Sequence, residues 1–266
     1  MDRRVAPTDP AKTAVVVVKL GGSAITDKGV AFSYRDEVVR ALGRAMKASD
    51  LRLVVVHGGG SFGHTVAKRY GLSSRRSSAS PDGVSETREA MFRLDAKVCA
   101  SLTQAGLHPY CFSPFSLLDL EDEGGVSFIE NLLGGGATPV TFGDVIHDGK
   151  GFRILSGDTM SVELSKMLGA QRCVMAMDVD GLLDADGNLI ESLGESTLGR
   201  MKKKRARTED ATGGIVLKVQ EALRMASSGT EVRFVSGLKP AEFSKALKGV
   251  EFRGTTVKVP PGVWSG

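Results

Sequence analysis

Short apolar runs alternate with longer amphipathic segments along this chain of 266 residues. The apolar runs are rich in valine and end in turn-forming residues, which predicts strands buried on both faces of a parallel sheet. The predicted strands are 14–20, 51–57, 108–112, 137–141, 172–178 and 231–235. The predicted helices are 34–48, 84–105, 159–168 and 214–228. Their alternation predicts an α/β fold with crossover connections.

Several segments carry clear end signals. Segment 84–105 has Ser85 as its expected N-cap and Gly106 as its expected C-terminal stop. Residues 145–155 predict a β-hairpin, because an Asp-Gly pair lies between two apolar runs. Polar segments at 73–83, 121–125 and 199–210 predict loops.

The chain is expected to fold as one domain after a short tail. Residues 1–12 lack the apolar core of a secretory signal, so they predict a disordered tail. Residues 13–266 contain no linker long enough to separate independent domains, and a soft boundary near 155–160 divides them into two halves.

Composition limits the partners and the compartment. A net charge of +4 suits small anionic substrates and does not call for nucleic acid. No apolar run approaches the roughly 18 residues that span a bilayer, so no membrane contact is expected. Cys99, Cys111 and Cys173 are widely scattered. We therefore expect neither a disulfide framework nor a zinc site, and a cytoplasmic location.

Two glycine-rich turns follow valine runs directly. The first contains Lys19 and spans 19–23; the second spans 57–64 and ends at His64. Glycine lets the backbone approach an anion, and the following helix offers free N–H groups. Two such turns predict a site for at least two phosphate groups, and hence phosphoryl transfer. The alternatives are a plain structural turn with a surface lysine and a capping or surface role for His64, whereas His57 is expected to be structural.

Other polar turns follow later in the chain, at 143–145, 156–158, 178–181 and 212–218. Asp158 is either the N-cap of a helix or a carboxylate that orients lysines or helps to hold Mg²⁺ through water. Residues 178–181 form an Asx-rich turn when read alone. No acidic residue stands beside the two glycine turns as a general base. The absence of a base is consistent with a phosphate acceptor, because a phosphate monoester is mostly dianionic at neutral pH and has no proton to lose before it attacks.

In this order the motifs resemble the amino acid kinase superfamily from about Val15 to the C-terminus, and within it the isopentenyl phosphate kinases. The matching segments are 19–23 with Thr26 and Lys28, 57–64, 143–145, 156–158, 178–181 and 212–218. In this superfamily the histidine that ends Ser-Phe-Gly-His separates phosphate-accepting kinases from carboxylate-accepting ones. Thr65 departs from the proline that the family commonly has at this position.

The resemblance implies a three-layer αβα sandwich with a mainly parallel central sheet. An acceptor lobe is expected at about 13–157 and a nucleotide lobe at about 158–266. The implied reaction transfers the γ-phosphoryl group of ATP to isopentenyl phosphate, in isoprenoid biosynthesis by an alternative mevalonate pathway. Mg²⁺ and a homodimer are also implied, with no metal-ligand cluster of the protein's own.

The resemblance also assigns the site residues. The catalytic residues are Lys19, Lys28, His64, Asp158 and Lys218, and Lys28 is the expected transition-state stabiliser. The acceptor phosphate is expected to contact Gly59, His64 and Gly157. The nucleotide-binding residues are Lys19, Gly21, Gly22, Ser23, Gly60, Asp178, Asp180, Gly181, Gly214 and Lys218.

Other functions stay open. A phosphonate kinase resembling fosfomycin kinase shares the histidine after the glycine-rich turn. A non-catalytic nucleotide- or anion-binding protein is disfavoured, because it would not need Lys19, Lys28, Asp158 and Lys218 together. Acetylglutamate, glutamate and uridylate kinases are disfavoured, because they give His64 no role.

Two segments have both a structural and a functional interpretation. Met91, Phe92 and Val98 on helix 84–105 are candidates for the wall of a prenyl slot, although packing into the core is the favoured interpretation. The basic run 202–205 predicts a solvated loop, with electrostatic steering of ATP as the alternative.

Overall fold

The computed structural model describes residues 14–27, 29–73, 80–114, 123–184, 186–194 and 213–257, apart from the side chains of Glu123 and of residues 213–217. The strands are β1 (Val15–Leu20), β2 (Arg52–His57), β3 (Pro109–Cys111), β4 (Thr138–Phe142), β5 (Asp144–His147), β6 (Phe152–Leu155), β7 (Arg172–Met177), β8 (Ser192–Leu193), β9 (Glu231–Ser236) and β10 (Gly254–Val257). The helices are α2 (Gly22–Ile25), α3 (Asp36–Lys47), α4 (Gly60–Arg69), α5 (Pro81–Gln104), α7 (Glu123–Gly134), α8 (Gly157–Met167), α10 (Gly213–Ser227) and α11 (Pro240–Lys248).

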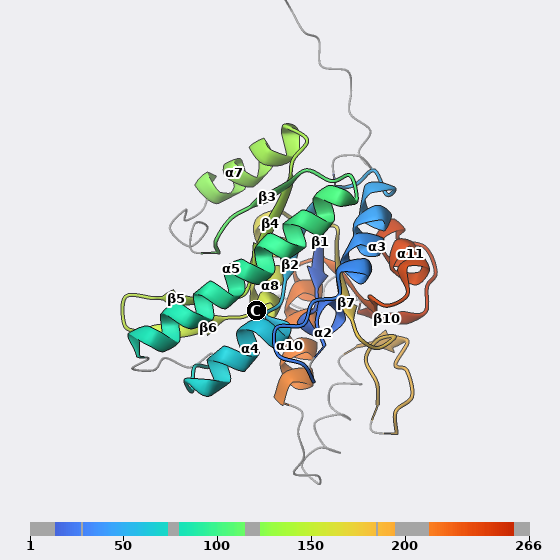
Figure 1. The fold of residues 1–266 in the computed structure, drawn as a ribbon. Coiled ribbons are helices and arrows are strands. Elements are labelled where there is room, and N and C mark those ends of the chain that lie inside the picture. The colour runs from blue at the N-terminus through green and yellow to red at the C-terminus, as the bar shows by residue number, and fades with distance from the viewer. Residues whose placement is uncertain are drawn as a thin grey trace, which may run out of the picture.

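Eight strands form one sheet in the order β3-β4-β2-β1-β7-β9-β10-β8 (Figure 1). The pairings are parallel except that β10 runs antiparallel to β9. Strands β5 and β6 form a separate antiparallel hairpin, as the sequence predicts. The predicted α/β fold with a mainly parallel sheet is therefore confirmed.

Strand β1 shows why helices cover both faces of the sheet. All six of its residues are buried, and alternate residues enter two different cores. Val16 and Val18 pack with side chains of α3, α4, α5 and α11, whereas Val15 and Val17 pack with side chains of α7, α8 and α10. Because the side-chain period of a strand is two, a continuous valine run supplies both layers of the sandwich.

Some predicted boundaries are wrong. Helix α5 begins at Pro81 rather than near Ser85, and its N-cap is Ser80, whose hydroxyl accepts a bond from the Gly83 amide over 3.1 Å. The Pro-Asp-Gly segment looks like a turn, but proline also suits the first position of a helix, where no N–H is needed. The predicted turn 121–125 is likewise wrong from Glu123 onward, where α7 begins.

Other predictions fall outside the described residues. These are the tail 1–12, most of the loop 73–83 and the whole loop 199–210, with its basic run 202–205.

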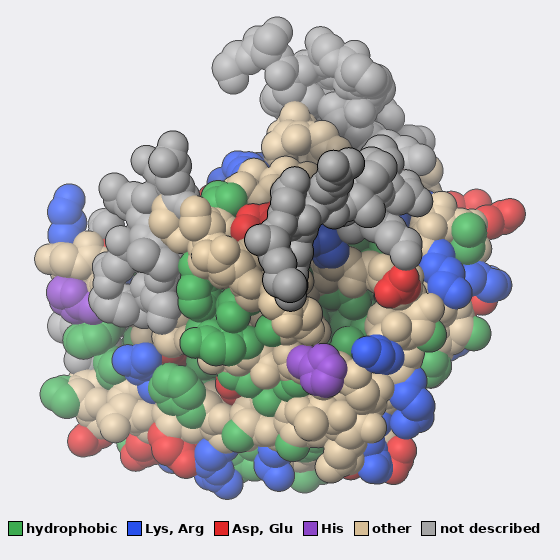
Figure 2. Space-filling model, turned by 90° about the horizontal axis from the view of Figure 1, so that it is seen from above, with side chains coloured by type: hydrophobic (Ala, Val, Ile, Leu, Met, Phe, Trp, Pro, Cys, Tyr) green, Lys and Arg blue, Asp and Glu red, His purple; other side chains and the backbone are tan. Residues whose placement is uncertain are grey.

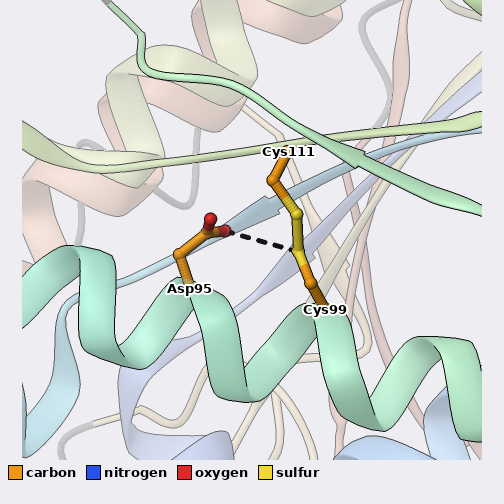
Figure 3. A group of neighbouring side chains, drawn as sticks. All are labelled: Asp95, Cys99 and Cys111. Atoms are coloured by element: carbon orange, nitrogen blue, oxygen red, sulfur yellow. Dashed lines mark hydrogen bonds between the residues drawn. A yellow bond between two sulfur atoms is a disulfide. The ribbon is translucent and has the colours of Figure 1, made fainter.

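The expectation of no disulfide framework is wrong for Cys99 and Cys111. Cys99 on α5 and Cys111 at the end of β3 form a disulfide, with Cα atoms 7.0 Å apart (Figure 3). The chain turns back at Gly106, which has φ +88°, so that β3 packs against α5. Sequence spacing alone does not show this return. Cys173 is free and buried, and the argument from unpaired cysteines to a cytoplasmic location loses its support.

Asp95 lies one turn before Cys99, with Oδ1 3.7 Å from the Cys99 sulfur (Figure 3). Within the described ranges, Asp95, Cys99 and Cys111 form the one group of three side chains with metal-ligand spacing. Metals bind cysteine as the thiolate. The disulfide leaves this group no thiolate to offer.

Acidic and basic side chains are interspersed on the face shown in Figure 2, so the described part of that face carries no extended patch of one charge. Among the described residues, no helix has the length and apolar character needed to cross a membrane.

We predict that reduction of the Cys99–Cys111 disulfide lowers the free energy of unfolding by about 3 kcal/mol. The bond closes a loop with a sequence separation of 12 residues, and a closed loop restricts the unfolded chain. Urea unfolding with and without a reductant measures the difference. A Cys99→Ser/Cys111→Ser double variant is the control and should not respond to reductant. If the unfolding midpoint of the unaltered protein does not change when reductant is added, the prediction is wrong.

Candidate functional site

A cleft of about 450 Å³ opens at the carboxyl ends of β1, β2, β4 and β7. Ligands of open parallel sheets commonly bind at this edge. The structure brings most of the predicted site residues to the cleft wall. These are Lys19, Gly21, Gly22, Ser23, Gly59, Gly60, His64, Gly157, Asp158, Asp178 and Lys218.

The two glycine turns contact each other through backbone atoms. A Cβ added to Gly22 would lie 2.3 Å from the Gly60 nitrogen, and Gly60 has φ +48°. Thr26 connects the same turns, because its hydroxyl donates to the Gly22 carbonyl over 2.7 Å and accepts from the Ser61 amide over 2.9 Å. A side chain at Gly22 or Gly60 would therefore separate the turns.

Each glycine turn leads into a helix that begins at the cleft wall. Gly60 begins the ten-residue helix α4, and Gly22 begins the short helix α2. The first N–H groups of a helix have no intrahelical acceptor. Gly22, Ser23 and Gly60, the first residues of these helices, line the cleft, whereas the Ser61 amide is bonded to the Thr26 hydroxyl. The arrangement suits an anion, as the sequence predicts.

Lys19, Asp158 and Lys218 form a charged cluster in the cleft. The Lys19 Nζ donates to Asp158 Oδ1 over 2.5 Å. The Lys218 Nζ donates to Asp158 Oδ2 over 2.8 Å and to Oδ1 over 3.2 Å. The three residues come from β1, α8 and α10, which are far apart in the sequence. One carboxylate therefore orients two cations toward a shared space.

Burial and charge shift the pKa of two members of this cluster. Burial lowers the pKa of Lys19, and the nearby charge of Lys218 lowers it further. Asp158 opposes both effects, which leaves the value at about 8. Burial would raise the pKa of Asp158, but the charges of Lys19 and Lys218 outweigh it and lower the value to about 2. At neutral pH, Asp158 is ionised and Lys19 is mostly protonated.

A neighbouring residue leaves the Asp158 carboxylate available to these lysines. The N-cap of α8 is Ser156, whose hydroxyl accepts from the Thr159 amide over 3.1 Å. Asp158 lies in the first turn, where the helix dipole stabilises a negative charge. The N-cap interpretation of Asp158 is therefore wrong, and its carboxylate binds the lysines instead.

The two histidines occupy different environments. His64 is exposed on α4 and lines the cleft beside the glycine turns. His57 is fully buried; its ring stacks on Phe142, and its Nε2 lies 3.2 Å from Asp95 Oδ1. The structural role predicted for His57 is confirmed.

The predicted nucleotide residues are only partly brought together. Asp178 lines the cleft and accepts a bond from the Ser23 hydroxyl over 2.7 Å. Asp180 instead pairs with Lys239 over 2.6 Å and with Arg253 over 2.7 Å, and these bonds lower its pKa.

Gly181, Gly214 and Lys28 complete the predicted set. A Cβ on Gly181 would lie 2.6 Å from the Thr255 hydroxyl, so this glycine allows close packing beside β10. Gly214 is the second residue of α10. Lys28 lies outside the described residues.

Sequence reasoning missed an ion pair at the cleft wall. Asp144 is buried at the start of β5, and Arg88 on α5 donates to it over 3.1 Å. Burial raises the pKa of Asp144 although Arg88 opposes the shift. The Gly-Asp-Val motif at 143–145 marked the position, but the partner on α5 carries no signal in the sequence. The Arg88–Asp144 ion pair connects the β5–β6 hairpin to α5.

The three prenyl-slot candidates separate in the structure. Met91 is buried and lines the cleft, whereas Val98 packs in the core. Phe92 is 45% exposed and contacts the Phe142 ring edge to face. Thr87, one turn before Met91, also lines the cleft and was not predicted.

Comparison with known proteins agrees with this geometry. Residues 14–236 match the sequence model of the amino acid kinase family. The chain is 30% identical to the isopentenyl phosphate kinase of Methanothermobacter thermautotrophicus, over 91% of this chain and 98% of that protein. It is 37% identical to the Haloferax volcanii isopentenyl phosphate kinase, over 80% and 88%. A crystal structure of an isopentenyl phosphate kinase substrate complex superposes with a TM-score of 0.74 at 26% identity, covering 92% of this chain and all of that one.

We predict that Asp158 stabilises the fold above about pH 4 and that this contribution is lost as the pH falls to about 2. Its folded pKa is about 2 against an ordinary 3.8, so the unfolded chain takes up the proton first, and the difference corresponds to about 2 kcal/mol. Urea unfolding of the unaltered protein and of Asp158→Asn between pH 2 and 6 measures it. The stability difference between the two should shrink toward pH 2, and a constant difference would contradict the assignment.

Proposed function

Because this chain belongs to the amino acid kinase family, and to the isopentenyl phosphate kinases within it, we propose that it transfers the γ-phosphoryl group of ATP to isopentenyl phosphate. The products are ADP and isopentenyl diphosphate. The observation that carries the proposal is the Lys19–Asp158–Lys218 cluster, which shares one cleft with two glycine turns and His64.

The cleft provides what this reaction needs. A phosphate monoester is mostly a dianion at neutral pH, so its oxygen can attack without a general base. The bond between the γ-phosphorus and the β–γ bridging oxygen breaks as the acceptor oxygen bonds to that phosphorus. Repulsion between two anionic phosphates is the main obstacle, and positive charge with fixed N–H donors reduces it.

Each member of the charged cluster has a defined part. Lys19 and Lys218 place positive charge at the transferring group, and Lys19 keeps most of its charge below about pH 8. Asp158 is a poor base, because its pKa is about 2. We therefore assign it the role of holding the two ammonium groups in place.

The remaining roles follow from the resemblance. His64, Gly59 and Gly157 bind the acceptor phosphate. Gly21, Gly22, Ser23 and Gly60 bind the donor phosphates. Asp178, Asp180, Gly181 and Gly214 form the nucleotide pocket, and Lys28 stabilises the transition state. The two lobes, the homodimer and the alternative mevalonate pathway are likewise proposals drawn from the resemblance.

Mg²⁺ fits this cleft through the nucleotide rather than through a protein cage. The carboxylates that line it already have partners: Asp158 binds two lysines, Asp178 accepts from Ser23, and Asp144 binds Arg88. Mg²⁺ is often held by one or two carboxylates together with substrate phosphates. When bound, the ion would neutralise charge on the phosphates of ATP.

An ADP-release assay with ATP, Mg²⁺ and a set of acceptors tests the proposal. Isopentenyl phosphate should be turned over in strong preference to fosfomycin, N-acetylglutamate and uridylate. His64 and the glycine turns suit a phosphate rather than a carboxylate, and Met91, Val145 and Ile154 suit a short hydrocarbon tail rather than a nucleoside. Turnover of fosfomycin alone would reassign the enzyme to phosphonates. Absence of turnover with every acceptor would favour an anion-binding protein.

We predict that His64→Ala lowers kcat/KM for isopentenyl phosphate by about 10²–10³, as removal of a positioned hydrogen-bond donor does in other enzymes. His108→Ala is the matched control, because His108 is exposed between α5 and β3 and does not line the cleft. Steady-state kinetics on both variants measure the effect. Unchanged kcat/KM in His64→Ala would exclude His64 from the acceptor site.

A further inference from the structure

Ser61, the second residue of α4, joins the second glycine turn to segment 26–33, which follows α2. It is 4% exposed and lines the cleft. Its amide donates to the Thr26 hydroxyl over 2.9 Å, and its carbonyl accepts from the Phe32 amide over 3.3 Å. Its hydroxyl donates to the Ser33 carbonyl over 3.2 Å and lies 3.3 Å from the Ser33 hydroxyl. The amide, the carbonyl and the hydroxyl of Ser61 therefore all bond to this one segment.

Ser33 carries these bonds further along the segment. Its hydroxyl accepts from the Asp27 amide over 2.7 Å and donates to the Asp27 carbonyl over 3.1 Å. The Asp27 carboxylate in turn accepts from the Gly29 amide over 2.9 Å. Asp27 and Gly29 are the sequence neighbours of Lys28. The backbone on either side of Lys28 is therefore connected to Ser61 through Ser33.

Phe32 holds the far end of the segment in an unfavourable backbone conformation. It has φ +56°, which bulky residues seldom adopt. Its ring packs edge to face on the buried Phe62 ring with centroids 5.4 Å apart, and the Arg93 guanidinium lies 5.4 Å from the centre of the Phe32 ring. Strained residues persist only where the surrounding structure fixes them, and they cluster at functional sites. Contacts with α4 and α5 thus set the path of the segment at a cost in stability.

We propose that Ser61 is a positioning residue for phosphoryl transfer, which acts by holding segment 26–33 and hence Lys28. The inference rests on the proposed function, in which Lys28 stabilises the transition state and the second glycine turn binds the phosphates. Ser61 needs no contact with substrate for this role. Because its bonds join the segment to the first turn of α4, a change at Ser61 alters the position of the segment relative to that glycine turn, and small errors of position slow catalysis.

Steady-state kinetics with ATP, Mg²⁺ and isopentenyl phosphate test the inference. Ser61→Ala removes the hydroxyl bonds and keeps the two backbone bonds. It should lower kcat about tenfold, the equivalent of one hydrogen bond. The KM for each substrate should stay within about twofold, because no substrate contact is lost. A raised KM with an unchanged kcat would mean that Ser61 binds substrate directly, and would overturn the inference.

A double-mutant cycle with Lys28 separates positioning from a general loss of structure. If Ser61 acts through Lys28, Ser61→Ala should change the residual kcat of Lys28→Ala by less than about twofold. An equal fall of kcat in both backgrounds would overturn the inference, because the effect of Ser61 would then not require Lys28.

Ser101→Ala is the matched control. Ser101 is a buried serine of α5 whose hydroxyl donates to Asp36 over 2.6 Å, and it does not line the cleft. This variant should lower the Tm by an amount similar to that of Ser61→Ala and leave kcat unchanged. An equal loss of kcat in Ser101→Ala would show that lost stability explains both variants, and would overturn the inference.

Ser33→Ala tests the same connection if Ser61→Ala does not fold. It removes the two bonds between the Ser33 hydroxyl and Asp27. It should also lower kcat about tenfold and lose this effect in the Lys28→Ala background. A tenfold fall that persists in that background would contradict the inference.

The outcomes distinguish this inference from the proposed function. Turnover of isopentenyl phosphate together with additive effects of Ser61 and Lys28 overturns the inference alone. Failure of the unaltered enzyme to turn over isopentenyl phosphate overturns the proposed function, and the inference falls with it.

Discussion

The buried ammonium of Lys19 is the constraint on which the site depends. A charge in this position requires a fixed partner, and Asp158 provides one at 2.5 Å. That single contact joins β1, at the centre of the sheet, to the first turn of α8. Lys218 then binds the same carboxylate from α10. Removing one partner of a buried ion pair leaves an uncompensated charge. The three elements are therefore held in one arrangement before any substrate binds.

Local chemistry made the centre of the fold predictable from the sequence. Valine runs such as 15–18 predict buried parallel strands, because a continuous apolar run places apolar side chains on both faces of the sheet and so contributes to both cores. The two glycine turns predict the anion site because close backbone approach is their physical reason. Strands β8 and β10 were missed, since Ser192–Leu193 is too short and Gly254–Val257 too polar to show a strand pattern. They form one edge of the sheet because β10 pairs with β9 and β8 pairs with β10.

Contacts between distant segments account for what the sequence does not show. The Cys99–Cys111 disulfide depends on how β3 returns along α5. The ion pairs of Asp180 with Lys239 and Arg253, one at each carboxylate oxygen, also depend on distant segments. Thr87 lines the cleft, and Arg88 reaches Asp144 in its wall, because α5 packs against β5. In each case the decisive partner lies far along the chain, and no local pattern identifies it.

The contact between Gly22 and Gly60 sets a distance by backbone atoms alone. Side chains can change rotamer and adjust to one another, but two main chains in van der Waals contact cannot approach further. In the proposed reaction both glycines bind the donor phosphates, so the position of those phosphates would be insensitive to most substitutions around the cleft. Residues of α5 and of the β5–β6 hairpin line the cleft away from this contact, so under the proposed function they could vary without moving the donor phosphates. A contact between two main chains would thus keep the donor in one place while the side chains around the acceptor change.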